Sequence, residues 1–153
     1  MAFFKKVDLS GKYAAIDVVN YFLTRGIEKN YQLSNLQVQK ILYYIQRDFL
    51  KNDSRALFSD DFEAWQFGPV IRKIYNDFCG FGAMPIYYLP QQAKEINPAD
   101  AERIGKIVDE KRRYSPWELV NDTHAKNKAW DLVYRNGAGY ENIIPKELIM
   151  YYG

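Results

Sequence analysis

The segment at residues 34–51, SNLQVQKILYYIQRDFLK, constrains the fold more than any other part of this sequence. At 100° per residue its apolar side chains fall on two sides of a helix, with Lys40, Arg47 and Lys51 assigned to a charged strip. The wide apolar face holds Val38, Ile41, Leu42, Ile45 and Phe49. A helix with two apolar sides is typical of the centre of a domain, so we predict a central helix that begins at the SNLQ capping box.

A strip of mixed polarity lies beside that face and contains Leu36, Gln39, Tyr43, Gln46 and Leu50. The polar members should be partly buried in a central helix, and buried polar groups need hydrogen-bond partners. Two interpretations remain open. The favoured one is a structural network, because buried polar groups are usually satisfied within the fold; the other is a polar lining for the backbone of a partner.

Five other segments carry helical signals. Three of them show the periodic spacing of apolar residues or a capping box, and two are short and bounded by turn residues. We expect helices at residues 11–28, from Asn97-Pro98 onward, from the SPWE box at residues 115–118, at residues 127–135, and from Pro145 onward.

The pattern changes from helical to alternating at residues 55–67, which predicts short strands in a hairpin turned around residues 59–61. Gly68 then gives the backbone freedom to bend, and Pro69 suits the first turn of a further helix. A short strand is also possible at residues 86–89. The stretch around Gly68 and Pro69 is therefore interpreted as a strand-to-helix corner.

These elements predict a mainly α protein: a compact single-domain helical fold over residues 1–153, with a small β hairpin between the second and third long helices. A chain of 153 residues that is 48% hydrophobic is long enough to bury one sizeable core. Its 25 aromatic residues, 13 Tyr, 9 Phe and 3 Trp, are far more than a disordered chain carries. The chain should fold as one unit.

Charge and cysteine content narrow the function classes. The net charge of +2 is too small for the basic footprint of an electrostatic nucleic-acid binder, so nucleic acid is not an expected partner. Cys79 is the only cysteine and His124 the only histidine, which excludes an internal disulfide and a thiolate-rich zinc site. The apolar run at residues 41–45, which no other run exceeds in length, is far short of a signal sequence or membrane span. We expect a cytoplasmic protein without a membrane partner.

Motifs of catalytic sites are missing from the sequence, which has no nucleophile elbow, phosphate-binding loop, dinucleotide fingerprint or zinc-protease motif. His124 with the nearby Asp122 resembles an oriented base, but no nucleophile accompanies it, and a packed or capping role is favoured. Asp60, Asp61 and Glu63 have the chemistry of Mg²⁺ ligands, yet three acids at a turn usually form a solvated tip. We expect no catalytic residues, no metal and no cofactor, and therefore not an enzyme.

The motifs described so far carry a family resemblance. The segments LQVQKILYYIQRDFL (residues 36–50) and LFSDDFEAWQFGPVIRKIYNDF (residues 57–78), with the later Thr123, His124 and Trp130, resemble the Panacea domain family, also called the SocA-like antitoxin family. The most specific piece is AWQFGPV together with the preceding QKILYY. The resemblance covers most of the chain.

The resemblance implies a compact, mostly helical, non-enzymatic domain that is found in prophage and bacterial defence settings. Such domains act as the antitoxin of a toxin–antitoxin pair and neutralise a partner toxin, generally by binding it. We therefore expect a protein toxin, encoded by an adjacent gene, as the partner. The alternative is a prophage-encoded DNA-binding or regulatory protein without catalytic activity, for which the strip of Lys40, Arg47 and Lys51 would be the basic surface.

Candidate partner-binding residues gather around the corner and the mixed strip. Tyr, Trp and Arg dominate the hot spots of protein interfaces, which favours the aromatic and arginine positions near the corner. Trp65 is interpreted first as a buried part of the fold and second as a binding anchor. The candidate set is Trp65, Phe67, Gly68, Pro69, Arg72, Tyr75, Gln39, Tyr43 and His124.

Overall fold

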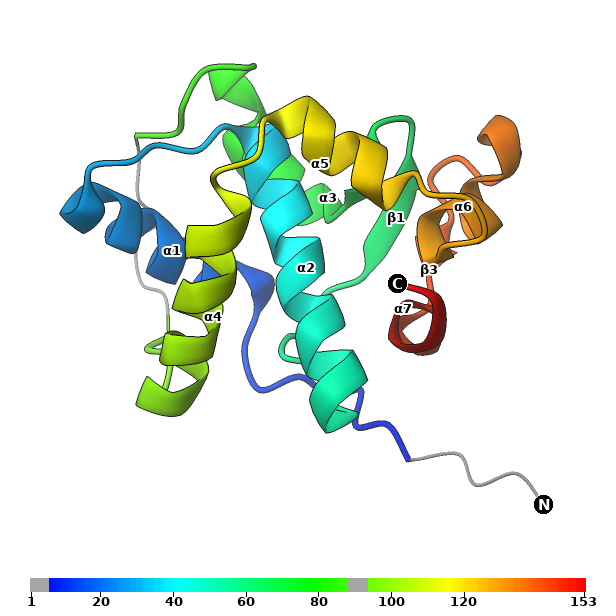
Figure 1. Cartoon of the computed structure of the whole chain (residues 1–153), viewed down its shortest axis with the longest axis horizontal. Helices are drawn as coiled ribbons and strands as arrows, with labels where there is room; N and C mark the ends of the chain where they lie inside the picture. The colour runs from blue at the N-terminus through cyan, green and yellow to red at the C-terminus, as the bar shows by residue number, and fades with distance from the viewer. Residues whose placement is uncertain (1–5, 88–93) are drawn as a thin grey trace.

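The computed structural model describes residues 6–87 and 94–153. Within them the protein is mainly helical, with a small antiparallel sheet (Figure 1). The α-helices are α1 (Ala15–Lys29), α2 (Asn35–Asp53), α3 (Arg72–Phe78), α4 (Pro98–Lys111), α5 (Pro116–Thr123), α6 (Ala129–Tyr134) and α7 (Lys146–Tyr152). The strands are β1 (Phe62–Trp65), β2 (Gly68–Val70) and β3 (Ile143–Ile144), and short 3-10 turns follow α3 and α6 at Cys79–Phe81 and Arg135–Gly137. The predicted fold class is confirmed.

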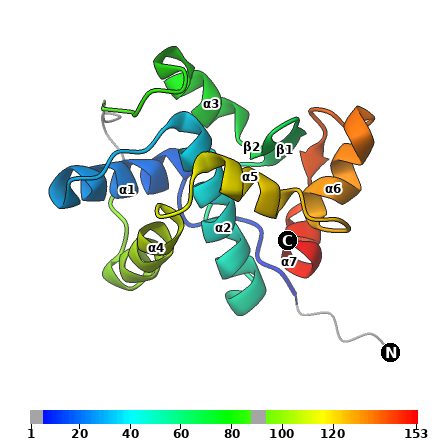
Figure 2. The ribbon, with the colours of Figure 1, turned by 45° about the horizontal axis from the view of Figure 1, so that its top comes forward.

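Helix α2 lies at the centre of the protein (Figures 1 and 2). Helices α1 and α4 pack together on one side of it, while α6, β3 and α7 gather on the other, and α5 crosses it. The capping box is formed as predicted, since Ser34 Oγ accepts from the amide of Gln37, and Gln37 Oε1 accepts from the amide of Ser34. The helix ends at Asp53, and its C-cap residue Ser54 adopts a left-handed conformation with φ of 53°. The prediction of a central helix is therefore correct.

The hairpin differs from the prediction in its turn and in its second strand. Residue Trp65 pairs with Gly68, so the turn consists of Gln66 and Phe67 rather than residues 59–61. Gly68 and Pro69 belong to strand β2, and α3 begins three residues after Pro69, so the prediction of Pro69 in a first helical turn is wrong. The corner exists, but Ile71 is the residue at which strand becomes helix.

The two acidic residues of the predicted turn at residues 59–61 form tertiary contacts instead. Asp60 accepts a 2.8 Å hydrogen bond from the amide of Ala15 at the start of α1. Asp61 forms a 2.6 Å ion pair with Lys146 of α7. Because these carboxylates tie distant helices to the segment before β1, their polarity does not mark a chain reversal.

The remaining helices match the predicted segments, with shifts at their ends. Helix α1 begins at Ala15, four residues later than predicted. Asp17 in its first turn is buried, and its carboxylate accepts hydrogen bonds from the amides of Ala14 and Lys94. The possible strand at residues 86–89 lies partly outside the described residues. Its described residue Ile86 is not in a strand and donates its amide to the carbonyl of Leu33 at 2.8 Å.

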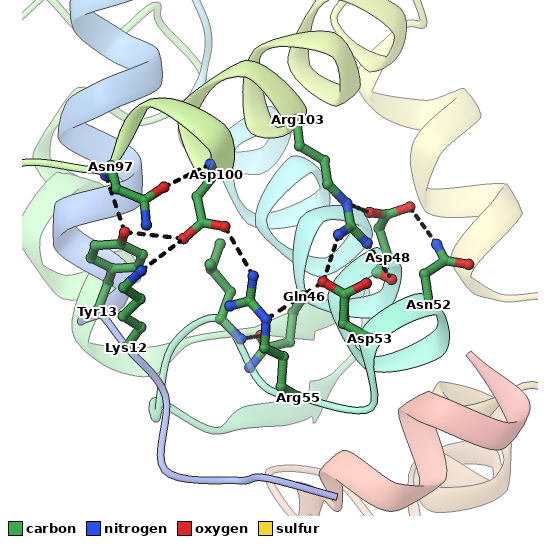
Figure 3. Close-up of polar contacts among 11 residues, drawn as sticks. Lys12, Tyr13, Gln46, Asp48, Asn52, Asp53, Arg55, Asn97, Asp100 and Arg103 are labelled. Carbon is green, nitrogen blue, oxygen red and sulfur yellow. Dashed lines mark hydrogen bonds and ion pairs between the residues drawn. The ribbon is translucent and has the colours of Figure 1, made fainter. Parts of the chain in front are cut away.

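A network of ions fastens α4 to the C-terminal half of α2 (Figure 3). Arg103 of α4 pairs with Asp48 at 2.6 Å and with Asp53 at 2.7 Å, and its guanidinium lies 4.1 Å from the centre of the buried Phe49 ring. Tyr13, Arg55 and Lys12 converge on the carboxylate of Asp100, which also belongs to α4. This side of α2 is thus fully engaged in holding the fold.

No helix within residues 6–87 and 94–153 is long and apolar enough to cross a membrane.

Candidate functional site

Two side chains of α2 hold the edge of strand β2. Gln39 Oε1 accepts the amide of Ile71 at 2.8 Å, while its Nε2 donates to the carbonyl of the same residue at 3.4 Å. Lys40 Nζ donates to the carbonyl of Pro69 at 3.0 Å. An edge strand normally leaves such groups open to water or to another strand. Here side chains of the central helix satisfy them, and the hairpin is fixed in place.

Lys40 is fully buried, so its predicted place on a charged strip is wrong. Burial disfavours the ammonium form and lowers the pKa of Lys40 to about 7. Arg47 is half-buried, with its guanidinium 4.7 Å from the centre of the Tyr44 ring, and Lys51 alone of the three is exposed. No continuous basic strip remains on α2, which removes the observation that favoured DNA binding.

Gly68 has a backbone conformation and close neighbours that would strain any residue with a side chain at this position. Its φ is +113°, a region that L side chains rarely adopt. A Cβ atom at this position would lie 2.7 Å from Cε of Lys40 and 2.9 Å from Oγ1 of Thr123. The glycine therefore allows the backbone of β2 to approach the buried lysine closely.

His124, Trp130 and Tyr134 form a stack of rings that contacts the hairpin. The rings of His124 and Trp130 are parallel with centroids 3.8 Å apart, and Trp130 stacks in turn on Tyr134 at 4.5 Å. Trp130 Nε1 donates a 2.8 Å hydrogen bond to the carbonyl of Trp65. This C-terminal motif is thus a support for the hairpin.

His124 does not form the suggested pair with Asp122. Asp122 accepts instead from the hydroxyl of Tyr44. In the described part of the chain, Nε2 of His124 is buried without a hydrogen-bond partner. Desolvation lowers the pKa of His124, and the nearby Lys40 lowers it further, so the neutral imidazole is favoured.

The three carboxylates considered as cation ligands face different partners. Asp60 caps the start of α1 and Asp61 pairs with Lys146, as described above. Glu63 pairs with Arg72 at 2.8 Å. Among the described residues no group of three or more His, Cys, Asp or Glu side chains is placed to hold a metal ion.

The most prominent concave surface beside the hairpin is an aromatic groove. It has a volume of about 600 Å³ and lies between the start of α2, the hairpin, α3, the start of α5 and the segment after α6. Within the described chain its lining contains no Asp, Glu, Lys, Arg or His side chain. Its aromatic lining consists of Trp65, Phe67, Tyr75, Trp117, Tyr134 and Tyr140. We call this surface the aromatic groove.

Ring contacts organise the walls of the aromatic groove. Trp65 and Tyr75 have ring centroids 5.0 Å apart, and Phe67 and Trp117 meet edge to face at 5.3 Å. Arg72 lies at the rim with its guanidinium 5.1 Å from the centre of the Trp65 ring, and it pairs with Glu63 and Glu141. Aromatic pairs of this kind are favoured beyond the area they bury, so the walls are largely preformed.

The structure brings four of the predicted partner-binding residues together. Trp65, Phe67, Tyr75 and Gln39 all line the aromatic groove, and Arg72 stands at its rim. Trp65 is half-buried rather than fully buried, so its ring serves both the fold and the groove.

The other four predicted residues lie behind the groove. Gly68 and Pro69 are buried in β2, and His124 belongs to the stack on Trp130. Tyr43 is 3% exposed and packs edge to face against Phe62 at 5.3 Å. These residues shape the wall from within and offer little surface to a partner.

Sequence reasoning did not assign Asn35, Trp117 or Tyr140 to the site, although all three line the groove. One sequence signal could have identified Trp117 as a surface residue. It follows the proline of the SPWE box on a short helix, and no core contact was predicted for its ring. Tyr140 reaches the groove through the pairing of β3 with β1, which depends on contacts far apart in the sequence.

Residues 38–131 match the family described as the antitoxin SocA-like Panacea domain. The chain belongs to this family. It is also 32% identical over 135 residues to the protein named Antitoxin SocA from Caulobacter vibrioides (strain NA1000 / CB15N), a match that covers 80% of this chain and 70% of that protein. No solved structure matches the chain.

The family match spans most of the surface described here. It contains α2 from Val38 onward, the whole hairpin, α3, α5 and Trp130. Tyr134 and Tyr140 lie outside the matched residues. The hairpin and its support by Lys40 are therefore within the part that defines the family, and one wall of the groove is built from residues beyond it.

Proposed function

We propose that this protein is an antitoxin that neutralises a protein toxin by binding it directly. The observation that carries the proposal is membership of the SocA-like Panacea family together with 32% identity to a protein named as an antitoxin. The partner is a toxin encoded by an adjacent gene, and the complex forms in the cytoplasm without catalysis.

The site supports binding rather than chemistry. Two polar side chains that hold the hairpin are committed to the backbone: Gln39 to Ile71, and Lys40 to Pro69. His124, the one candidate base, is stacked on Trp130, and the carboxylate suggested to orient it, Asp122, accepts from Tyr44 instead. A preformed groove with several exposed aromatic rings, by contrast, has the composition of an interface hot spot.

The test is to express the adjacent open reading frame from an inducible promoter, alone and together with this protein at matched levels. We expect growth arrest by the neighbour alone, restored growth on co-expression, and co-purification of the two chains. A neighbour that is harmless alone, or that remains toxic beside this protein, would refute the antitoxin proposal.

Direct binding has its own readout. The amount of toxin in co-expressing cells should stay constant on immunoblots while growth recovers, and the purified pair should elute together in size-exclusion chromatography. Recovery of growth with loss of the toxin and no stable complex would mean that the toxin is removed rather than blocked.

A further inference from the structure

Asn35 presents an amide at the aromatic groove whose hydrogen-bonding capacity is only half used. The residue is 5% exposed and is part of the groove lining. Its Nδ2 donates to the carbonyl of Tyr75 at 3.4 Å, and its Oδ1 accepts from Nε2 of Gln39 at 3.5 Å. A primary amide has two N–H donors and an oxygen that accepts twice. Within the described residues, one N–H donor and one acceptor position of Asn35 therefore have no partner.

An adjacent donor and acceptor match the C=O and N–H of a single residue in an extended chain. The protein already contains one example of this pairing, because the amide of Gln39 binds both the N–H and the C=O of Ile71. Asn35 lies one helical turn before Gln39 on α2. A second segment of extended backbone, supplied by a partner, would meet Asn35 in the way that Ile71 meets Gln39.

The walls of the groove select the side chains of that segment. Phe67, Tyr75, Trp117 and Tyr140 remain 47%, 39%, 56% and 50% exposed, so their rings have apolar area left to cover. A charged side chain placed among them would lose part of its hydration, and the lining offers it no counter-charge. An uncharged, apolar segment fits this lining.

The exposure of the walls also favours a protein segment over a small molecule. Sites for small ligands bury roughly 70–90% of the ligand in a concave cavity. Here four aromatic side chains stand about half exposed around the opening. Rings in that state are typical anchors that a larger partner covers and shields from water.

We propose that the aromatic groove binds a short, extended, uncharged segment of the partner toxin. The amide of Asn35 binds the backbone of one residue of the segment, and apolar side chains on either side of it pack against Phe67 and Trp117. This inference rests on the proposed antitoxin function and adds the surface and the chemistry by which the toxin is held.

Cys79 provides a direct readout of occupancy. It is the only cysteine of the chain, it is exposed, and it lines the groove. The rate of its alkylation by iodoacetamide is measured for the free protein and for the complex purified with the product of the adjacent gene. We expect at least about tenfold slower alkylation in the complex, since a segment in the groove would cover the thiol.

Two variants, each titrated with the same toxin, then test the Asn35 amide and the aromatic wall separately. Asn35→Asp removes both N–H donors of the amide, including the one bonded to Tyr75, at nearly constant size, and an acid in the first turn of α2 is compatible with the helix dipole. Trp117→Ala removes an exposed wall. We expect each to weaken toxin binding about tenfold or more, equivalent to about 1.4 kcal/mol. The matched control is Tyr152→Ala on α7, an aromatic residue that is 51% exposed and outside the groove, which should bind as the unmodified protein does.

The outcomes separate the groove from the antitoxin function. A toxin complex in which Cys79 reacts as fast as in the free protein, and to which both groove variants bind normally, would overturn the groove and leave the antitoxin function standing. Absence of any complex with the unmodified protein would count against the proposed function itself.

The chemistry of the groove can be tested without the toxin. Two of the three tryptophans, Trp65 and Trp117, line it, so tryptophan fluorescence reports binding. Acetylated and amidated hexapeptides with a central Leu-Phe pair are compared with the same peptides carrying Glu or Lys at those two positions. We expect binding of the neutral peptide at concentrations on the order of 1 mM and at least about tenfold weaker binding of the charged ones. Equal binding of both kinds, or none by the neutral peptide, would overturn the proposal.

Discussion

Lys40 and Pro69 are joined by a hydrogen bond inside the protein, from the ammonium of a fully buried lysine to the carbonyl of a strand residue. Pro69 lies in the AWQFGPV motif and Lys40 in QKILYY, so the bond links the two most recognisable segments of the sequence. Gly68 leaves room for it, since a Cβ there would meet Lys40. The two motifs therefore form one structural unit, a hairpin seated on the central helix.

This buried lysine should make stability depend on pH. Its pKa is lowered to about 7 in the folded protein, while an unfolded lysine titrates near 10.4. Between these values the unfolded chain binds more protons, so stability rises with pH from about 7 upward, by as much as about 1.4 kcal/mol per pH unit. The stability gained at higher pH is lost as the pH falls to about 7. Urea unfolding at pH 7, 8 and 9 measures it.

Lys40→Met should remove most of that rise, because residue 40 then takes up no proton on unfolding. The matched control is Lys106→Met, whose side chain is 78% exposed and which should keep the pH dependence of the unmodified protein. Measurements do not go above pH 9 because burial also raises the pKa of Tyr31, Tyr43 and Tyr44, which lowers stability above about pH 10. Identical pH profiles for Lys40→Met and the unmodified protein would show that the lysine is hydrated in solution.

Gly68→Ala should destabilise the hairpin. Positive φ alone costs a residue with a Cβ about 1–2 kcal/mol, and the contacts with Lys40 and Thr123 add to it. Two other glycines separate these effects. Gly82 also has positive φ but nothing within 4 Å of a Cβ, so Gly82→Ala should show the backbone cost alone.

Gly80→Ala completes this comparison, because Gly80 has neither a positive φ nor a neighbour within 4 Å. It should be close to neutral in thermal denaturation. We expect the loss in stability to increase from Gly80→Ala to Gly82→Ala to Gly68→Ala. A Gly68→Ala protein as stable as Gly80→Ala would mean that β2 adopts ordinary backbone angles in solution.

Local signals in the sequence predicted much of the fold. The capping boxes at Ser34 and Ser115 are both formed, because each depends on residues only three positions apart. The hairpin turn was misplaced because strand β2 is defined by its contacts with Gln39 and Lys40, some thirty positions earlier in the chain. Strand β3 was missed for the same reason, since its two residues pair with β1 about eighty positions away.

The candidate site was predictable in part. Aromatic residues near AWQFGPV were chosen on composition, and Trp65, Phe67 and Tyr75 do line one groove. Lys40 was misassigned because helical periodicity gives the side of a helix on which a residue lies, and not what packs against that side. In a central helix every side meets a neighbour, so a lysine on the polar side can still be buried.

Gln46 and Gln39 should each contribute to stability through bonds to backbone. Gln46 accepts the amide of Leu57 at 2.8 Å and donates to the carbonyl of Phe58 at 2.8 Å. These bonds join Gln46 to the segment before β1, whereas Gln39 bonds to Ile71 after β2. The two glutamines therefore do not bond to each other. Replacement by Leu leaves buried backbone groups unpaired, so we expect a loss of about 1–3 kcal/mol for each variant.

Urea unfolding measures these losses, and amide hydrogen exchange locates them. Protection should fall at Leu57 in Gln46→Leu and at Ile71 in Gln39→Leu, because each amide loses its acceptor. Gln66→Leu, at an exposed position of the hairpin turn, serves as the control and should change stability little. Unchanged stability in Gln39→Leu combined with weaker toxin binding would instead assign Gln39 to the interface.

Trp130 provides the last test, because it joins the C-terminal stack to the hairpin by a single bond from Nε1 to the carbonyl of Trp65. Trp130→Phe keeps a ring between His124 and Tyr134 but removes that bond, and should cost about 0.5–1.5 kcal/mol. Trp130→Ala also removes a buried ring, since the residue is only 6% exposed, and should cost about 3–5 kcal/mol.

Circular dichroism follows the unfolding of these variants, because tryptophan fluorescence changes with the substitution itself. Trp117→Phe is the matched control: Trp117 is 56% exposed, and the same exchange there should leave the denaturation midpoint almost unchanged. If Trp130→Phe were as stable as Trp117→Phe, the indole bond would contribute nothing and stacking alone would join the motif to the hairpin. If Trp130→Ala were also neutral, the stack would not support the hairpin, and the position of Trp65 would depend on Arg72 and Tyr75 instead.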